Sequence, residues 1–261
     1  MNMIFVNTRF FCYNIDMYKY FFFLLLLLFL LIPFSSDAQD IDTDGDGLSD
    51  LEETTIYFTD PKLADTDGDG FDDQVEIGAG YSPRFGGKKK LIQVDSDKDY
   101  LNDLWELTLG TGLMNPDSDG DKYLDGTEVA AGYDPLNSEK TKLDKLIKVD
   151  LKTQHLDYYF GDKLFGSFPI SGGVKSMPTP IGDFTILDKV PVKHYGGGNF
   201  DYPNTKWNLH FVTKQYRYYI HGAYWHNNFG QPMSHGCVNV SYENMEPLYW
   251  FAQVGTKVEI K

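Results

Sequence analysis

The chain has 261 residues and a net charge of −15 at pH 7. The acidity is confined to one segment, because residues 40–135 include 25 acidic and 7 basic side chains, whereas residues 136–261 include 11 acidic and 14 basic ones. This division excludes one uniform domain and predicts two modules of different chemistry. We expect no nucleic-acid partner for so acidic a chain.

The N-terminus contains an unbroken apolar run, FFFLLLLLFLLI, at residues 21–32. Basic residues precede the run (Arg9 and Lys19), and small residues follow it near Ala38. Roughly 20 apolar residues are needed to cross a bilayer, so this shorter run predicts a cleaved signal peptide over residues 1–39. An uncleaved membrane anchor is the alternative, and Met17 is an alternative start. We therefore expect an exported protein.

Cleavage of that segment would remove Cys12 and leave Cys237 as the one cysteine of the mature chain. Cys237 then has no partner for an internal disulfide. An odd cysteine in an oxidising compartment is a buried bystander, an intermolecular bridge or a reactive thiol. The cysteine count alone leaves these three readings open.

Four twelve-residue windows repeat in the acidic segment: DTDGDGLSDLEE, DTDGDGFDDQVE, DSDKDYLNDLWE and DSDGDKYLDGTE. Acidic residues occupy positions 1, 3, 5, 9 and 12 of each window, and an apolar or aromatic residue occupies position 7. Ca²⁺ takes about 6 to 8 oxygen ligands, which alternate Asp side chains, a backbone carbonyl and a closing Glu can supply. A disordered acidic tract is the alternative, but the shared register argues against it. The candidate calcium ligands are Asp42, Asp44, Asp46, Leu48, Asp50, Glu53, Asp65, Asp67, Asp69, Phe71, Asp73, Glu76, Asp95, Asp97, Asp99, Leu101, Asp103, Glu106, Asp117, Asp119, Asp121, Tyr123, Asp125 and Glu128.

Position 6 of the windows differs between the two halves of the segment. The first two windows have Gly47 and Gly70 there, which suit a sharp turn, whereas the last two have Tyr100 and Lys122. We therefore expect weaker calcium binding in the last two windows. A short helix and a proline follow each window, and no regular helix precedes it, so paired EF-hands fit poorly.

This pattern resembles the thrombospondin type 3 calcium repeats of bacterial envelope proteins. The resemblance covers residues 40–135, with an irregular insertion, FGGKKKLIQ, between the second and third windows. It implies an elongated spacer with little apolar core, which calcium stiffens, and an envelope protein as a candidate partner of this region. We expect a linker over residues 136–144.

From residue 145 onward the sequence predicts a mostly β domain. Short runs rich in aromatic and β-branched residues, such as LDYYF, LFGSFPIS, FTIL and YRYYIHG, are separated by glycines. One helix is predicted after Ser241, whose hydroxyl is a plausible N-cap, with Met245, Leu248 and Phe251 facing a core. The final GTKVEIK predicts another strand.

Cys237 needs a neighbouring base if it is to act as a nucleophile, because a free thiol is mostly protonated at neutral pH. His235 is near in sequence, but His221, at the end of YRYYIHG, can approach from an adjacent strand. Gly236 permits a tight turn before the cysteine, where backbone amides can hold an oxyanion. Two alternatives remain: a zinc site formed by Cys237 with His221, His226 and His235, or a merely buried thiol.

His221 followed by SHGCVN (residues 234–239) resembles the signature of the L,D-transpeptidase catalytic domain of the YkuD type. MPTPIGDFTI (residues 177–186), the opening strands from residue 145 and the final GTKVEIK are similar to further segments of that family. The resemblance covers residues 145–261. It implies a β-sandwich-like fold with one C-terminal helix and cysteine attack on a peptidoglycan stem peptide, in the cell envelope, periplasm or surface of a bacterium.

By position, the resemblance makes Cys237 the nucleophile and His221 the general acid and base. Ser234, His235, Gly236 and Asn239 would shape the pocket, with backbone amides near Gly236 and Cys237 as oxyanion donors. The acyl group would pass to an amine of a second stem peptide and form a 3→3 cross-link, with no cofactor for catalysis.

The family pattern leaves the acyl acceptor open. The loop over residues 222–233 is shorter than usual, and Trp207, Tyr224 and Trp225 are candidates for lining the cleft. An L,D-carboxypeptidase that trims stem peptides, and a non-catalytic wall-binding or adhesive module that depends on calcium, are the alternatives.

Overall fold

The computed structural model describes residues 41–198, 200–214 and 216–261. The predicted signal peptide and Cys12 lie outside the described residues. Within the described part, no helix is both long enough and apolar enough to span a membrane.

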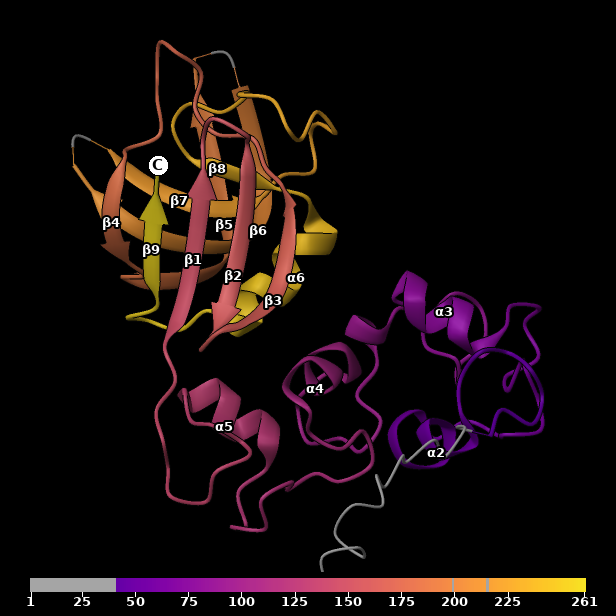
Figure 1. Cartoon of the computed structure of the whole chain (residues 1–261). Helices are drawn as coiled ribbons and strands as arrows, with labels where there is room; N and C mark the ends of the chain where they lie inside the picture. The colour runs from indigo at the N-terminus through magenta and orange to yellow at the C-terminus, as the bar shows by residue number, and fades with distance from the viewer. Residues whose placement is uncertain (1–40, 199, 215) are drawn as a thin grey trace, which may run out of the picture. The chain divides into compact units, whose positions relative to one another are not determined.

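Two β-sheets form the C-terminal domain, and they lie face to face in Figure 1. One sheet has the strand order β3-β2-β1-β9-β4 and the other the order β5-β6-β7-β8. This arrangement confirms the predicted mostly β, sandwich-like fold with one C-terminal helix. The elements are β1 (Lys145–Asp150), β2 (His155–Phe160), β3 (Lys163–Pro169), β4 (Gly182–Thr185), β5 (Asp188–Gly197), β6 (Phe200–Thr213), β7 (Arg217–Gly222), β8 (Val238–Val240), α6 (Tyr242–Phe251) and β9 (Lys257–Ile260).

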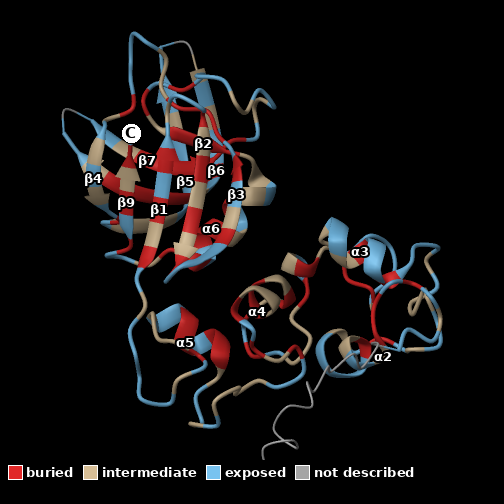
Figure 2. Cartoon of the chain, viewed as in Figure 1, coloured by how far each residue is buried: buried red, intermediate tan, exposed pale blue. Residues whose placement is uncertain are grey.

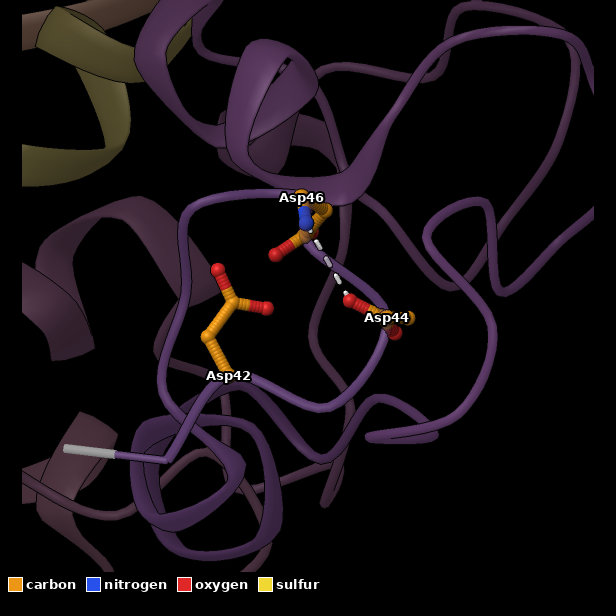
Figure 3. Close-up of side chains that lie close together, drawn as sticks. All are labelled: Asp42, Asp44 and Asp46. Carbon is orange, nitrogen blue, oxygen red and sulfur yellow. Dashed lines mark hydrogen bonds between the residues drawn. The ribbon is translucent and has the colours of Figure 1, made fainter.

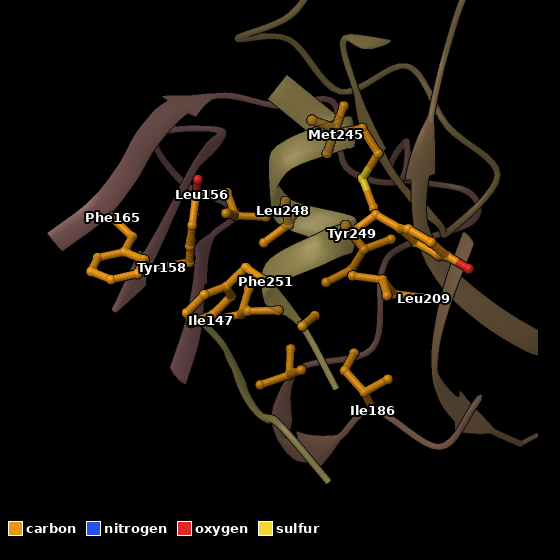
Figure 4. Packing of buried hydrophobic residues seen from close by; sticks show 14 of the residues in the cluster. Ile147, Leu156, Tyr158, Phe165, Ile186, Leu209, Met245, Leu248, Tyr249 and Phe251 are labelled. Carbon is orange, nitrogen blue, oxygen red and sulfur yellow. The ribbon is translucent and has the colours of Figure 1, made fainter. Parts of the chain in front are cut away.

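Both sheets and α6 contribute to one apolar core (Figures 2 and 4). Ile147 and Val149 of β1 are buried, as their alternation with polar residues predicts. The Ser241 hydroxyl accepts a hydrogen bond from the Asn244 N–H and caps α6. The helix residues predicted to face the core, Met245, Leu248 and Phe251, are buried.

The hairpin of β5 and β6 was not among the predicted strands. Its two strands pair antiparallel from Asp188 opposite His210 to Gly197 opposite Phe200. Most of β5 is exposed or partly exposed, so its sequence lacks the apolar alternation that marks a core strand.

Short helices follow the four acidic loops in the N-terminal region. Three of them begin at position 9 of a window and end at a glycine in a left-handed conformation, which is a common helix stop. The first window ends in a three-residue helix, which also begins at position 9 and continues as a π-helical turn. The elements are α2 (Asp50–Glu52), η1 (Glu53–Tyr57), α3 (Asp73–Ala79), the 3₁₀ turn η2 (Leu91–Gln93), α4 (Asp103–Leu109) and α5 (Asp125–Ala131).

The supposed insertion and the supposed linker fold in the same way. Tyr81 bridges Lys90 after the second window, and Tyr133 bridges Lys142 after the fourth. The surrounding backbone hydrogen bonds also match, including Leu91 N–H to Gly80 O and Leu143 N–H to Gly132 O, each 3.0 Å. The region is therefore a tandem of two similar units, each with two acidic loops and a closing hairpin.

The third repeat joins the core of the C-terminal domain, and residues Asp42–Lys261 form one compact unit. Trp105 of α4 stacks on Phe165 of β3 with ring centroids 4.9 Å apart, and it makes edge contacts with Tyr158 and Phe251. Its indole Nε1–H donates to the Phe165 carbonyl at 3.2 Å. Phe165 is a bulge residue without a partner on β2, so this hydrogen bond satisfies a carbonyl at an irregular point of the ladder.

Candidate active site and candidate calcium sites

The parallel pair of β7 and β8 brings the predicted histidine and cysteine to one pocket. His221 near the end of β7 lies opposite Asn239 of β8, and Cys237 immediately precedes β8. The pocket has a volume of about 80 Å³. It is lined by Tyr195, Phe200, Tyr202, His221, Trp225, Met233, Ser234, His235, Cys237 and Asn239.

The His221 imidazole is buried and fixed in one orientation. Its Nδ1 lies 2.9 Å from the Gly222 carbonyl, which can only accept, so Nδ1 carries the proton and Nε2 is the basic nitrogen. Tyr195 of β5 stacks on the ring with centroids 4.6 Å apart and planes at 26°. Burial lowers the pKa of His221 to about 4, so the ring is neutral at pH 7.

The Cys237 thiol is partly buried in the same pocket. Burial raises the pKa of Cys237 to about 11, although a backbone hydrogen bond from Tyr219 and the charge of Lys193 both lower it. The resting pair of Cys237 and His221 is therefore a neutral thiol beside a neutral imidazole.

A hydrogen-bonded turn over residues 234–237 presents the thiol. The Ser234 hydroxyl donates to the Cys237 carbonyl and accepts from the Gly236 N–H at 3.1 Å. Gly236 has a φ of +108°, and a Cβ atom there would lie 2.6 Å from Cε1 of Tyr218. Both the conformation and the space therefore require glycine.

Of the two amides predicted as oxyanion donors, that of Gly236 already donates to Ser234 within this turn. No residue in the described part of the chain accepts a hydrogen bond from the Cys237 N–H. The Cys237 amide is thus the better placed of the two for an oxyanion.

His235 and Asn239 take different positions at the pocket. The exposed His235 ring stacks on Phe200 at 4.7 Å, whereas Asn239 is buried with its amide 3.2 Å from Nε2 of His226. The Asn228 N–H donates to Nδ1 of His226 at 3.3 Å.

The aromatic residues around the pocket differ in part from those expected. Trp225 lines the pocket and stacks on Tyr202, with centroids 3.8 Å apart and planes at 5°. Trp207 and Tyr224, the other two aromatic residues expected there, pack against Tyr242 instead. The sequence analysis missed Tyr195, because it lies on a strand that was not predicted.

The zinc alternative has no support in the geometry. Within the described residues, the groups of potential metal ligands that converge within 4.8 Å are four aspartate triplets, and none contains a histidine or a cysteine. The triplets are positions 1, 3 and 5 of the four windows. Figure 3 shows the first of them, with Asp42, Asp44 and Asp46 around one centre.

The four acidic loops contain buried carboxylate oxygens that have no hydrogen-bond partner. Such oxygens occur at positions 3 and 12 of every window, and an orphaned buried oxygen is costly unless a cation or water satisfies it. This donor set fits calcium, which prefers carboxylate and carbonyl oxygens. The residues at these two positions are Asp44, Glu53, Asp67, Glu76, Asp97, Glu106, Asp119 and Glu128, and Asp69 at position 5 of the second window has a further such oxygen.

The position-9 aspartates do not have free oxygens of this kind. In the third loop, Oδ1 of Asp103 accepts from the Ser96 N–H at 2.9 Å and Oδ2 from its hydroxyl at 2.8 Å. The same pair of hydrogen bonds recurs in the other three loops. These aspartates, predicted as calcium ligands, instead close each loop on its second residue; they are Asp50, Asp73, Asp103 and Asp125.

Burial and neighbouring aspartates raise the pKa of each position-12 glutamate. The pKa of Glu106 rises to about 9, and those of Glu53, Glu76 and Glu128 rise to about 7. Burial is the larger cause in each case, and the charges of the loop aspartates add to it. A divalent cation in the loop would reverse this penalty.

Residues 144–260 match the protein-family model of the L,D-transpeptidase catalytic domain, YkuD. The C-terminal domain is thus similar to the YkuD family over its whole length. Residues 42–64, 65–80 and 117–138 match the bacterial TSP3 repeat, and these stretches contain the first, second and fourth windows. Both resemblances noted in the sequence are thereby confirmed.

Two curated Bacillus proteins, to both of which L,D-transpeptidase activity is provisionally assigned, are similar to the YkuD-type part of the chain. YkuD of Bacillus licheniformis is 29% identical over 140 residues, which cover 52% of this chain and 79% of that protein. YqjB of Bacillus subtilis is 27% identical over 135 residues, which cover 48% of this chain and 76% of that protein.

Among solved structures, an L,D-transpeptidase from Mycobacterium smegmatis is 25% identical with a TM-score of 0.43. The match covers 47% of this chain and 60% of the solved one.

Proposed function

We propose that this protein is a peptidoglycan L,D-transpeptidase of the bacterial cell envelope, with Cys237 as nucleophile and His221 as general acid and base. The observation that carries the proposal is the fixed imidazole. His221 donates through Nδ1 to the Gly222 carbonyl and lines the Cys237 pocket, and among the described residues its basic nitrogen Nε2 has no hydrogen-bond partner. A role in wall binding alone does not require a thiol and a base in one pocket.

The acylation step begins from a neutral pair. Nε2 of His221 takes the thiol proton as the Cys237 sulfur attacks the carbonyl between residues three and four of a tetrapeptide stem. The Cys237 N–H donates to the developing oxyanion. The carbon–nitrogen bond then breaks, and D-Ala leaves with the proton that His221 returns to its amine.

The second step transfers the acyl group from sulfur to nitrogen. A side-chain amine of another stem attacks the thioester, His221 removes the amine proton, and Cys237 leaves as a thiolate that regains that proton. The product is a 3→3 cross-link. Water in place of the amine would give the L,D-carboxypeptidase reaction through the same thioester.

We also propose that each acidic loop holds a structural calcium ion. The ligands would be the aspartates at positions 1, 3 and 5, the carbonyl at position 7 and the glutamate at position 12. The orphaned oxygens at positions 3 and 12 support this assignment. The position-9 aspartates would not bind the ion directly; they fix the conformation of the loop by accepting hydrogen bonds from the residue at position 2.

Mass spectrometry of purified stem peptides incubated with the protein tests the enzymatic proposal. We expect a cross-linked dimer that lacks one D-Ala and a thioester adduct on Cys237, both absent with Cys237→Ala. A tripeptide product without dimer would identify the carboxypeptidase. Equal cross-linking by wild type and Cys237→Ala, at equal melting temperature, would refute the assignment of the nucleophile.

A further inference from the structure

A second concave site lies where the third repeat meets α6, and it shares no residue with the active-site pocket. It has a volume of about 550 Å³ and is formed by η2, the third acidic loop and one face of α6. We name it the α6 groove. This volume falls in the range of about 300–1,000 Å³ that is typical of small-molecule sites.

Two exposed aromatic rings line the α6 groove. Trp250 at the end of α6 is 62% exposed, and Tyr100 in the third loop is 78% exposed. Exposed large aromatic residues that gather at one concavity are typical of binding sites, because they offer flat apolar faces at little entropic cost. Trp250 and Tyr100 are 150 residues apart in sequence. Neither the stability of α6 nor that of the third loop requires the two exposed rings to lie at the same groove.

The polar side chains of the groove retain unused hydrogen-bonding capacity. Oε1 of Gln93 accepts from the Lys90 N–H, and Oδ1 of Asn102 accepts from the Trp105 N–H. Within the described chain, their amide nitrogens and the Glu246 carboxylate have no partner. The groove therefore offers free donors and acceptors between two aromatic faces.

Charge restricts the class of ligand. The one cationic group in the described lining, Lys90, is paired with Glu243, and Glu246 adds a negative charge. This balance disfavours an anionic polymer such as nucleic acid or a phosphate-rich wall polymer. A neutral ligand with apolar faces and many hydroxyl or amide groups suits the groove, and an N-acetylated oligosaccharide has this chemistry.

Tyr100 occupies a position that favours glycine. Its φ is +81°, and Gly47 and Gly70 adopt similar values at position 6 of the first two loops. A non-glycine residue in the left-handed region is strained, because its Cβ atom approaches the following carbonyl oxygen. Lys122 has the same left-handed conformation in the fourth loop, so the strained backbone of Tyr100 is not by itself evidence of a binding role. Tyr100 lines the groove, however, whereas Lys122 does not.

We propose that the α6 groove binds the glycan strand of peptidoglycan, a β-1,4-linked N-acetylhexosamine polymer, with sugar rings stacked on Trp250 and Tyr100. The choice of glycan rests on the proposed function, because the stem peptides of that substrate are attached to such strands. The third repeat thereby contributes to substrate binding as well as to support.

Calorimetric titration of the protein with chitohexaose tests the groove, in a Cys237→Ala background so that no turnover intervenes. We expect saturable binding that Trp250→Ala abolishes and that Tyr100→Gly weakens at least tenfold. Tyr100→Gly removes left-handed strain, so its melting temperature should not fall. Lys122→Gly is the matched control at the same loop position outside the groove, and it should bind chitohexaose as the parent protein does.

The outcomes separate this inference from the proposed function. Chitohexaose has no stem peptide, so its binding depends on the groove alone, whereas soluble stem peptides report on Cys237 alone. No binding of chitohexaose, or equal binding by Trp250→Ala and its parent, overturns the inference. Binding of a glycan-free peptide at the groove, lost in Trp250→Ala while chitohexaose fails to bind, would assign the groove to a peptide instead.

Discussion

Replacing Trp105 by alanine should destabilise the catalytic domain, even though Trp105 belongs to the acidic repeats. The Trp105 side chain is 6% exposed and contacts three aromatic rings of the catalytic domain, those of Tyr158, Phe165 and Phe251. Truncation of a buried tryptophan typically costs about 3–5 kcal/mol. The lost indole N–H also leaves the Phe165 carbonyl at the β-bulge without its partner.

The conservative variant Trp105→Phe divides this cost into two parts. It keeps much of the apolar contact but removes the donor to the Phe165 carbonyl, so the expected loss is about 1–3 kcal/mol. Urea unfolding in the presence of calcium measures both variants. With a slope of roughly 2–3 kcal/mol per molar urea, Trp105→Ala should lower the midpoint by about 1–2.5 M.

Trp250→Ala is the control, because Trp250 is a largely exposed tryptophan and its removal should change stability by less than about 0.5 kcal/mol. If Trp105→Ala unfolds at the same urea concentration as Trp250→Ala, the repeats do not share a core with the catalytic domain. The repeats would then act as the independent spacer that the sequence predicted.

Three further results are expected from pH and from local geometry. Because burial lowers the pKa of His221 to about 4, kcat/KM should stay level from pH 8 to pH 5 and fall near pH 4; a fall near pH 6.5 would contradict the buried neutral base. Because the pKa of Glu106 is raised to about 9, the folded chain holds more protons than the unfolded chain between about pH 4.5 and pH 9. The melting temperature in EDTA should therefore fall as pH rises from 5.5 to 8, and added calcium should remove that trend. If the melting temperature in EDTA rises over this pH range instead, the Glu106 carboxyl group is not buried as described. Gly236→Ala should abolish thioester formation through its clash with Tyr218, whereas Gly230→Ala, also at a positive φ but with open space around it, should still form the adduct.

The sequence predicted the parts of the fold that are encoded locally. Ile147 and Val149 alternate with polar residues, and Ser241 precedes a run with helical apolar spacing, so burial and capping could be read directly. The hairpin of β5 and β6 could not, because β5 contains no buried residue and only the second half of β6, with Leu209 and Phe211, reaches the core. Tyr195, which orients the His221 ring, was missed together with that hairpin.

A longer repeat in the acidic region was present in the sequence but was not detected at the scale of single windows. Gly-Tyr-x-Pro occurs at residues 80–83 and 132–135, and Lys-x-Lys-Leu occurs at residues 88–91 and 140–143. Comparison of the two halves, rather than of the four loops, would have replaced the insertion and the linker by two equivalent hairpins. The free oxygens at positions 3 and 12 could not be told from the bonded ones at position 9, because all are carboxylates at regular spacing.

The role of the third repeat follows from position 11 of its window. Position 11 is Glu52, Val75 and Thr127 in the other loops, and Val75 and Thr127 are exposed, whereas Trp105 is buried against β3. The seven-residue helix α4 therefore carries a core residue directly before Glu106, the proposed calcium ligand at position 12. A helix this short is not stable alone in water, so α4 depends on both the acidic loop and the sheet. Loss of calcium from the third loop should thus weaken the packing on β3, and loss of that packing should weaken calcium binding by the same free energy.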